Sequence, residues 1–317
     1  MNIPWHIISP VVKVFLIMGG GYLFFRLLPK AKILIPWILK ISINILLPLY
    51  FIYNLPAGWN DAVSAGRQWL LLFFCIFLGM MGAQLLLGYF FVGRKWETLF
   101  LMAFHNAGYL PFPILAAFAP KALLVYMYFY FLAFNLVFWT VSVAFFTKGN
   151  DKKTKRETAV NMPVIGIFLG ILVAAMGFYE RIPAFLEVPI RLGAETALPA
   201  VLFLVGAIVS TLSLKKLYFK KEYLLIILLK MIMYPVAFLF FGKFIPFSSF
   251  SPDLAAAAKI ALVLEAAVPP ATNILLTAKA YGTDSQVTYV GGAIFYTYIT
   301  SIVTVPLFLI ASFLVFG

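Results

Sequence analysis

The sequence predicts an all-α membrane protein of ten transmembrane helices, arranged as two inverted five-helix repeats in which helices four and nine are broken. Three observations lead to this fold class. The 317 residues are 64% hydrophobic and only 11% charged, whereas a soluble domain is about half apolar and a quarter charged. The basic residues gather in alternate connections between apolar stretches. Prolines recur at a nearly constant spacing in the two halves of the chain.

The apolar stretches set the number of helices. A membrane-spanning helix needs about 20 apolar residues, whereas barrel strands are about ten residues long and alternate in polarity, so long apolar stretches predict helices. The single cysteine, Cys75, excludes an internal disulfide bond. The ten expected spans are residues 5–28, 33–55, 69–92, 98–119, 122–147, 161–179, 190–212, 223–242, 254–280 and 286–315.

The distribution of charge orients these spans. Of the 24 Lys and Arg residues, 15 lie in the connections after spans one, three, five, seven and nine or at the span ends next to them, and 5 lie in or next to the other connections. Short cytoplasmic connections are enriched in Lys and Arg. We therefore expect an integral protein of the plasma (inner) membrane with both termini on the non-cytoplasmic side. The net charge of +13 is interpreted as a topology signal and not as a nucleic-acid footprint.

The two halves of the chain resemble each other at their prolines, which match in order at offsets between 151 and 158 residues. Because each half contains an odd number of spans, the halves enter the membrane in opposite directions, which is the architecture of many secondary transporters. The expected organisation is a first repeat over 1–147, a basic cytoplasmic linker over 148–160 and a second, inverted repeat over 161–317. The matching prolines are Pro10 and Pro163, Pro48 and Pro199, and the pairs Pro111/Pro113 and Pro269/Pro270.

Spans four and nine contain the residues that could carry chemistry. A proline removes a backbone donor and clashes with the carbonyl four residues earlier, so each proline pair predicts a break in its helix. Freed backbone groups in hydrocarbon are costly unless they line a polar cavity, so two matching breaks predict one binding site where the spans cross. Two ordinary proline kinks are the alternative interpretation. The polar residues at the breaks are His105, Asn106, Glu265, Thr272 and Asn273.

Glu265 is the candidate ion-coupling residue, with Thr272 beside it. It follows Asp253 by twelve residues, or about 18 Å of helix, which places it near the middle of the bilayer. An ionisable group at that depth is a functional candidate, and Na⁺ or H⁺ is the coupling ion expected there. A structural ion pair with Lys259, or a buried hydrogen-bonded glutamate, is the alternative. We expect Lys13, Lys40, Lys230 and Lys259 to extend toward the membrane surface, with Lys259 the strongest exception.

At these residues the chain resembles the auxin efflux carrier family of transporters, which includes the plant PIN carriers. The resemblance runs in order along essentially the whole chain. It is carried by INILLPLYFIYNL (43–55) in span two, NAGYLPFPIL (106–115) in span four, LPAVLFLVGA (198–207) in span seven and EAAVPPATN (265–273) in span nine.

The resemblance implies a scaffold of spans one, two, six and seven, a mobile bundle of the other six, and elevator-type alternating access. It also implies a small organic anion as substrate, such as auxin or a dicarboxylate, and a homodimer. This chain lacks the long cytoplasmic loop of many plant members, so regulation through that loop is not expected. Glu265 is also similar to the sodium-site glutamate of the more distant bile acid–sodium symporters, which implies coupling to a cation.

The expected function is a secondary transporter for a small organic anion in the lipid bilayer. Its carboxylate would lie near Asn106, with His105, Tyr53 and Asn273 as neighbours and Pro111, Pro113, Pro269 and Pro270 shaping the site. A membrane sensor that binds the anion without moving it is the alternative, and a channel is disfavoured. No enzyme or cofactor is expected, because only two histidines, His6 and His105, and no paired carboxylates, metal cluster or Ser/His/Asp set are visible.

Overall fold

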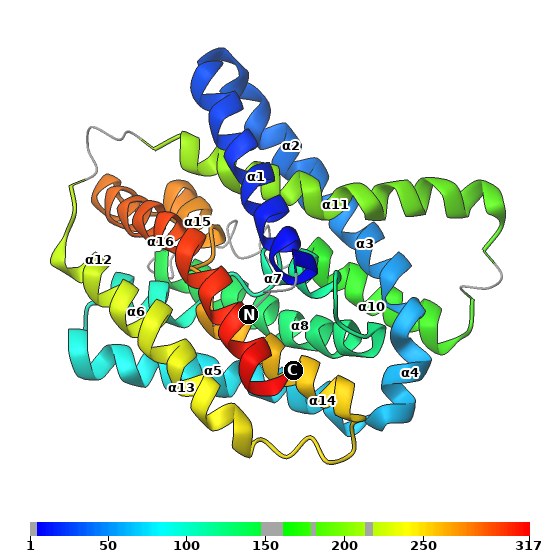
Figure 1. The fold of residues 1–317 in the computed structure, drawn as a ribbon. Helices are drawn as coiled ribbons and strands as arrows, with labels where there is room; N and C mark the ends of the chain where they lie inside the picture. The colour runs from blue at the N-terminus through cyan, green and yellow to red at the C-terminus, as the bar shows by residue number, and fades with distance from the viewer. Residues whose placement is uncertain (1–4, 147–160, 179–181, 213–217) are drawn as a thin grey trace.

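The protein is described from a computed structural model over residues 5–146, 161–178, 182–212 and 218–317 (Figure 1). Within these ranges all regular structure is helical, and extended backbone pairs at a single antiparallel bridge between His105 and Pro270. The all-α class is therefore confirmed. The expected linker, 148–160, lies outside the described residues.

Each expected span coincides with a helix or a run of consecutive helices. The first half comprises α1 (Trp5–Leu27), η1 (Pro29–Leu34), α2 (Ile35–Ile41), η2 (Ser42–Leu46), α3 (Leu47–Asn54), α4 (Pro56–Gly66), α5 (Gln68–Val92), α6 (Trp96–Ala103), α7 (Pro111–Leu115) and α8 (Lys121–Phe146). The second half comprises α10 (Met162–Ala175), α11 (Ala184–Ser210), α12 (Lys221–Ile226), η5 (Ile227–Met233), α13 (Tyr234–Phe241), η6 (Gly242–Phe244), α14 (Pro252–Ala267), α15 (Asn273–Tyr281) and α16 (Asp284–Phe316).

Seven helical segments among the described residues are long and apolar enough to cross a membrane, fewer than the ten expected. The difference falls on three expected spans. Helix α10 has 14 residues, and spans four and nine are each divided into two short helices, of which the longest, α14, has 16 residues. A helix shorter than about 17 residues does not cross the hydrocarbon core alone. The seven segments are Ile8–Leu27, Pro29–Asn54, Gln68–Val92, Lys121–Ser142, Ala184–Ser210, Lys221–Phe244 and Asp284–Phe316.

Large apolar side chains also cover the outside of the long helices. Side chains such as Leu16, Leu71, Phe90 and Val303 are more than 60% exposed, and Cys75 is exposed on α5. Exposed apolar surface on this scale is typical of a protein embedded in lipid. The protein is an integral membrane protein.

Two of the long segments contain a short π-helical turn, and a proline explains each. Pro48 lacks the backbone donor that would bond the carbonyl of Asn44, which lies inside η2. Pro235 stands in the same relation to Met231, which lies inside η5. Wider π turns accommodate the lost hydrogen bond and rotate the side chains on that turn. Lys230 lies on the second of these turns.

Helices α1, α3, α10 and α11 pack against one another, and α11 runs across both α1 and α3 (Figure 1). Two close approaches require glycine. A β-carbon at Gly206 of α11 would overlap the Met18 carbonyl oxygen of α1, and one at Gly166 of α10 would overlap the backbone of Pro48. The backbones of these helices are therefore in direct contact, and such close packing favours a rigid unit of α1, α3, α10 and α11.

Candidate functional site

The two proline-induced breaks meet in the core of the protein. Helix α6 ends at Ala103 and α7 begins at Pro111, while α14 ends at Ala267 and α15 begins at Asn273. Between these helix ends, the two connecting segments are extended and run antiparallel to each other. The Asn106 backbone N–H donates to the Pro269 carbonyl at 2.9 Å, and the Ala271 N–H donates to the Phe104 carbonyl at 2.9 Å. We call this meeting point the crossing.

The hydrogen bonds of the crossing offset the free-energy cost of breaking two helices inside an apolar protein. Backbone groups freed by a break must find partners when they are buried away from water. Here each broken segment supplies partners to the other. Pro111 occupies the first turn of α7, where a missing N–H carries no penalty. Pro269 and Pro270 are buried in the second break. Pro113 is half-buried within α7.

His105 and Asn106 are consecutive in the extended segment, so their side chains point to opposite sides of the crossing. On the Asn106 side, the Asn106 side-chain amide donates to the Tyr298 hydroxyl at 2.9 Å, and the Tyr109 N–H donates to Asn106 Oδ1 at 3.1 Å. The Tyr298 hydroxyl also interacts with Thr272, and Tyr109 interacts with Asn273. We call these five residues the amide face.

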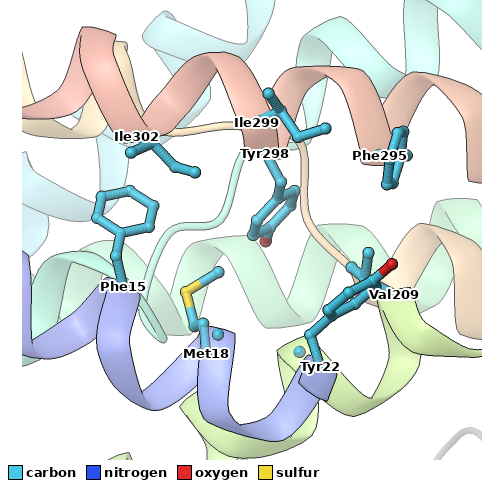
Figure 2. A pocket seen from close by; sticks show the side chains of 10 residues that line it. Phe15, Met18, Tyr22, Val209, Phe295, Tyr298, Ile299 and Ile302 are labelled. Carbon is cyan, nitrogen blue, oxygen red and sulfur yellow. The ribbon is translucent and has the colours of Figure 1, made fainter. Parts of the chain in front are cut away.

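Tyr298 connects the amide face to a cavity of about 290 Å³ between α1, α11 and α16, which it lines. Figure 2 shows Tyr298 projecting from α16 into this space toward α1, between Met18 and Val209. The remaining lining is apolar or aromatic and includes Phe15 and Phe295. Amide and hydroxyl groups beside an apolar cavity can bind a carboxylate while its carbon body lies among apolar side chains.

On the His105 side, the structure brings ionisable groups together. His105 Nε2 lies 2.7 Å from the Tyr130 hydroxyl and 3.4 Å from Glu265 Oε2, and His105 and Glu265 are fully buried. Lys230 interacts electrostatically with Glu265 and donates to Gln84 Oε1 at 3.4 Å. We call Gln84, His105, Tyr130, Lys230 and Glu265 the ionisable face.

The ionisable face is incompletely hydrogen-bonded. Among the described residues, neither carboxylate oxygen of Glu265 accepts a hydrogen bond, and Gln84 Nε2 has no acceptor. Buried polar groups are almost always paired, so the exceptions point to a functional role. A carboxylate beside an imidazole, a phenol and an ammonium can take up and release a proton. Within the described residues no group of three or more His, Cys, Asp or Glu side chains could hold a metal ion.

One expectation and one alternative about lysines need correction. Lys230 does not extend to the membrane surface, because it is fully buried beside Gln84 and Glu265. Lys259 is not the partner of Glu265, since its ammonium lies 5.8 Å from the centre of the Phe316 ring. The π turn that precedes Pro235 contains Lys230, and this proline is the signal in the sequence that could have drawn attention to it.

Of the other expected site residues, Thr272 lies with Asn273 on the amide face and not with Glu265 as expected, and Tyr53 belongs to neither face. Thr272 and Asn273 begin α15 and are buried on the amide face. Tyr53 is half-buried on α3, and the tyrosine that stacks on Phe112 is Tyr50, one turn earlier on that helix. Sequence reasoning missed Tyr130 and Tyr298. Their positions in long apolar helices carry no local pattern that separates them from ordinary core tyrosines.

Comparison with known proteins identifies one family. The family described as Membrane transport protein, the transport domain of the auxin efflux carriers, matches residues 146–309, just over half of the chain. The match includes the second break, with Glu265, Thr272 and Asn273. No curated protein matches the sequence.

Proposed function

The chain belongs to the membrane transport protein family of the auxin efflux carriers, and from this premise we propose that it is a secondary transporter for a small organic anion. Members of this family are transporters rather than enzymes. The observation that carries the proposal is the crossing, where two broken helices present polar groups near a cavity between α1, α11 and α16. Secondary transporters bind substrates and coupling ions at such breaks near the bilayer midplane.

The proposed architecture has ten spans in two inverted repeats, with both termini on the non-cytoplasmic side of the plasma membrane. The scaffold comprises α1, η1–α3, α10 and α11, and the remaining helices form the moving bundle. The close glycine contacts between α1 and α11 and between α10 and α3 support a rigid scaffold. The crossing lies in the bundle and faces α1 and α11 across the cavity, which suits elevator-type movement. A homodimer, as the resemblance to the plant carriers implies, completes the proposal.

The amide face is the proposed substrate site. Asn106, Thr272, Asn273 and Tyr298 offer neutral donors that can bind a carboxylate without a permanent positive charge. Hydrogen bonds to a charged group contribute about 1.5–3 kcal/mol each. The apolar lining of the neighbouring cavity favours an acid whose body next to the carboxylate is apolar. This geometry supports an auxin-like acid better than a dicarboxylate.

The ionisable face is the proposed coupling site. An ionised carboxylate in the bilayer core is costly unless a cation or proton accompanies it. Lys230 interacts electrostatically with Glu265, and its ammonium form disfavours a second, permanent cation there. This arrangement supports proton coupling at Glu265 over sodium coupling, with His105 and Tyr130 in reach of the transferred proton.

The test is uptake by proteoliposomes of radiolabelled lactate, malate and indole-3-acetate, each with an imposed pH gradient, with a sodium gradient and with neither. We expect accumulation of at least one monocarboxylate when the pH gradient is present. If these acids bind but no uptake occurs under any gradient, the protein is instead a membrane sensor that binds the anion without moving it.

Topology is tested separately in a Cys75→Ala background. Cysteines introduced at Asn60 and Asn150 should react with a membrane-impermeant maleimide from opposite sides, Asn150→Cys from the cytoplasm. Reaction of both positions from one side contradicts the ten-span arrangement.

A further inference from the structure

A second cavity, of about 310 Å³, lies between α1, α7 and α11. Its walls include Val14 of α1, Pro113 and Ala117 at α7, and Pro199 of α11. Lys13 is the one ionisable side chain among the residues that line it. The cavity therefore reaches from the scaffold to the broken helix α7, two residues beyond the Pro111 at which that helix begins.

A third gap, where the amide face meets α2 and α11, is much smaller. The gap beside Tyr109, Thr272 and Asn273, where they face α2 and α11, has a volume of only about 10 Å³. That is too small for more than a single water molecule. A sizeable cavity therefore adjoins α7, whereas the gap at the start of α15 is narrow, and the first cavity lies farther along α1 and α11, beside Tyr298. In the proposed topology α7 lies in the extracytoplasmic half of the membrane and α15 in the cytoplasmic half.

Lys13 lines the second cavity, on α1. It follows Trp5, the first residue of α1, by eight residues, or about 12 Å of helix, so it lies well inside the membrane boundary. Its neighbour Val14 and the facing Leu202 are buried, whereas Lys13 itself is exposed. Among the described residues no carboxylate pairs with it. A lone ammonium between low-dielectric walls raises the local concentration of anions.

We propose that this cavity is the extracytoplasmic vestibule of the transporter and that Lys13 binds the carboxylate of the organic anion there, before the anion reaches the amide face. This inference rests on the proposed function for the identity of the anion. The ammonium attracts the anion into the vestibule and releases it to Asn106. The neutral donors of the amide face then bind the anion through hydrogen bonds, so this second site needs no cation.

The experiment measures charge selectivity at the wall of the cavity and needs no transport. In a Cys75→Ala background, Ala117→Cys is labelled from outside intact cells with an anionic and a cationic methanethiosulfonate of similar size. With Lys13 present we expect the anionic reagent to react faster. Lys13→Gln should lower the anionic-to-cationic rate ratio by about threefold or more, as Coulomb attraction over a few ångströms of aqueous cavity predicts. Lys13→Arg should retain the ratio.

A matched control separates local from global effects. The same reagents are applied to Asn60→Cys on α4, where Lys13→Gln should leave the ratio unchanged. A ratio at position 117 that is insensitive to Lys13→Gln overturns the proposal. So does an Ala117→Cys variant that resists both reagents while the Asn60→Cys variant reacts, because the cavity would then be filled by lipid. Unchanged transport in Asn106 variants alongside an intact Lys13 effect would mean that the amide-face assignment fails while the vestibule stands.

Discussion

The amide face and the ionisable face lie on opposite sides of the same two extended segments, yet their polar groups are satisfied to different degrees. On the amide face Asn106 uses both ends of its amide, toward Tyr298 and the Tyr109 backbone. On the ionisable face both oxygens of Glu265 lack hydrogen bonds from the described residues. The side chains of one face are neutral and hydrogen-bonded, whereas the other face holds ionisable groups whose polar atoms lack partners among the described residues.

This difference explains how one crossing can serve both substrate binding and energy coupling. A neutral, fully bonded network is rigid and can present fixed donors to a substrate. Ionisable groups inside a membrane are expensive and are retained where their charge changes during function. We therefore assign substrate binding to the amide face and energy coupling to the ionisable face. The following substitutions test that division, from the largest expected effect to the smallest.

Glu265→Gln should abolish accumulation driven by a pH gradient, because the amide cannot take up or release a proton. Exchange of substrate between equal pools should persist, since the amide face is intact. Gradient-driven uptake and equilibrium exchange are measured in the same proteoliposomes. Glu222→Gln, which breaks only the 2.7 Å ion pair with Lys95 at the surface, is the control. If Glu265→Gln concentrates substrate as the wild type does, the coupling site lies elsewhere.

Lys230→Met should destabilise the protein, because the buried Glu265 carboxyl loses the ammonium with which it interacts electrostatically. Removing one partner of a contacting buried ion pair costs about 3–5 kcal/mol, and we expect a smaller loss here because Lys230 and Glu265 interact without direct contact. Thermal unfolding in detergent should show a lower Tm for Lys230→Met than for the wild type. The double variant with Glu265→Gln should recover most of that decrease in Tm. Lys259→Met, at a lysine that lies over the Phe316 ring, should change Tm far less. Equal Tm values for the single and double variants would mean that Glu265 and Lys230 are not energetically coupled.

Asn106→Ala should weaken substrate binding by about tenfold to a hundredfold, the value of one hydrogen bond to a charged group. The variant should still purify as a monodisperse species, since the backbone bond from Asn106 to Pro269 does not involve the side chain. Substrate-induced thermal stabilisation measures the loss. Asn54→Ala, where the amide bonds only the Tyr50 carbonyl of its own helix, should bind normally. Unchanged stabilisation of Asn106→Ala moves the substrate away from the amide face.

Tyr298→Phe should weaken binding by about threefold to tenfold, the contribution of one neutral hydrogen bond. Tyr234→Phe removes a comparable bond, to the Met80 carbonyl at 2.8 Å, away from the amide face. Binding affinity should therefore distinguish the two tyrosines. Similar losses in both variants would indicate that affinity reflects general stability and not a localised substrate site.

The crossing could be predicted from the sequence because a proline acts locally. The positions of Pro111 and Pro269 suffice to place the breaks, and Asn106 and Glu265 are visible beside them. The composition of each face could not be predicted in the same way. Lys230 reaches Glu265 because a π turn before Pro235 lies against α5 and α14, and that contact depends on tertiary packing. Tyr298 meets Asn106 across 192 positions of the chain, which no local pattern records.

The two broken segments hold each other through backbone hydrogen bonds between residues 104–106 and 269–271. Such bonds do not depend on which side chains the chain carries at these positions. Side chains at the crossing can therefore be exchanged, by evolution or by design, while the support beneath them stays in place. A change of transported acid would then require only a few substitutions on one face, and a change of driving ion only a few on the other.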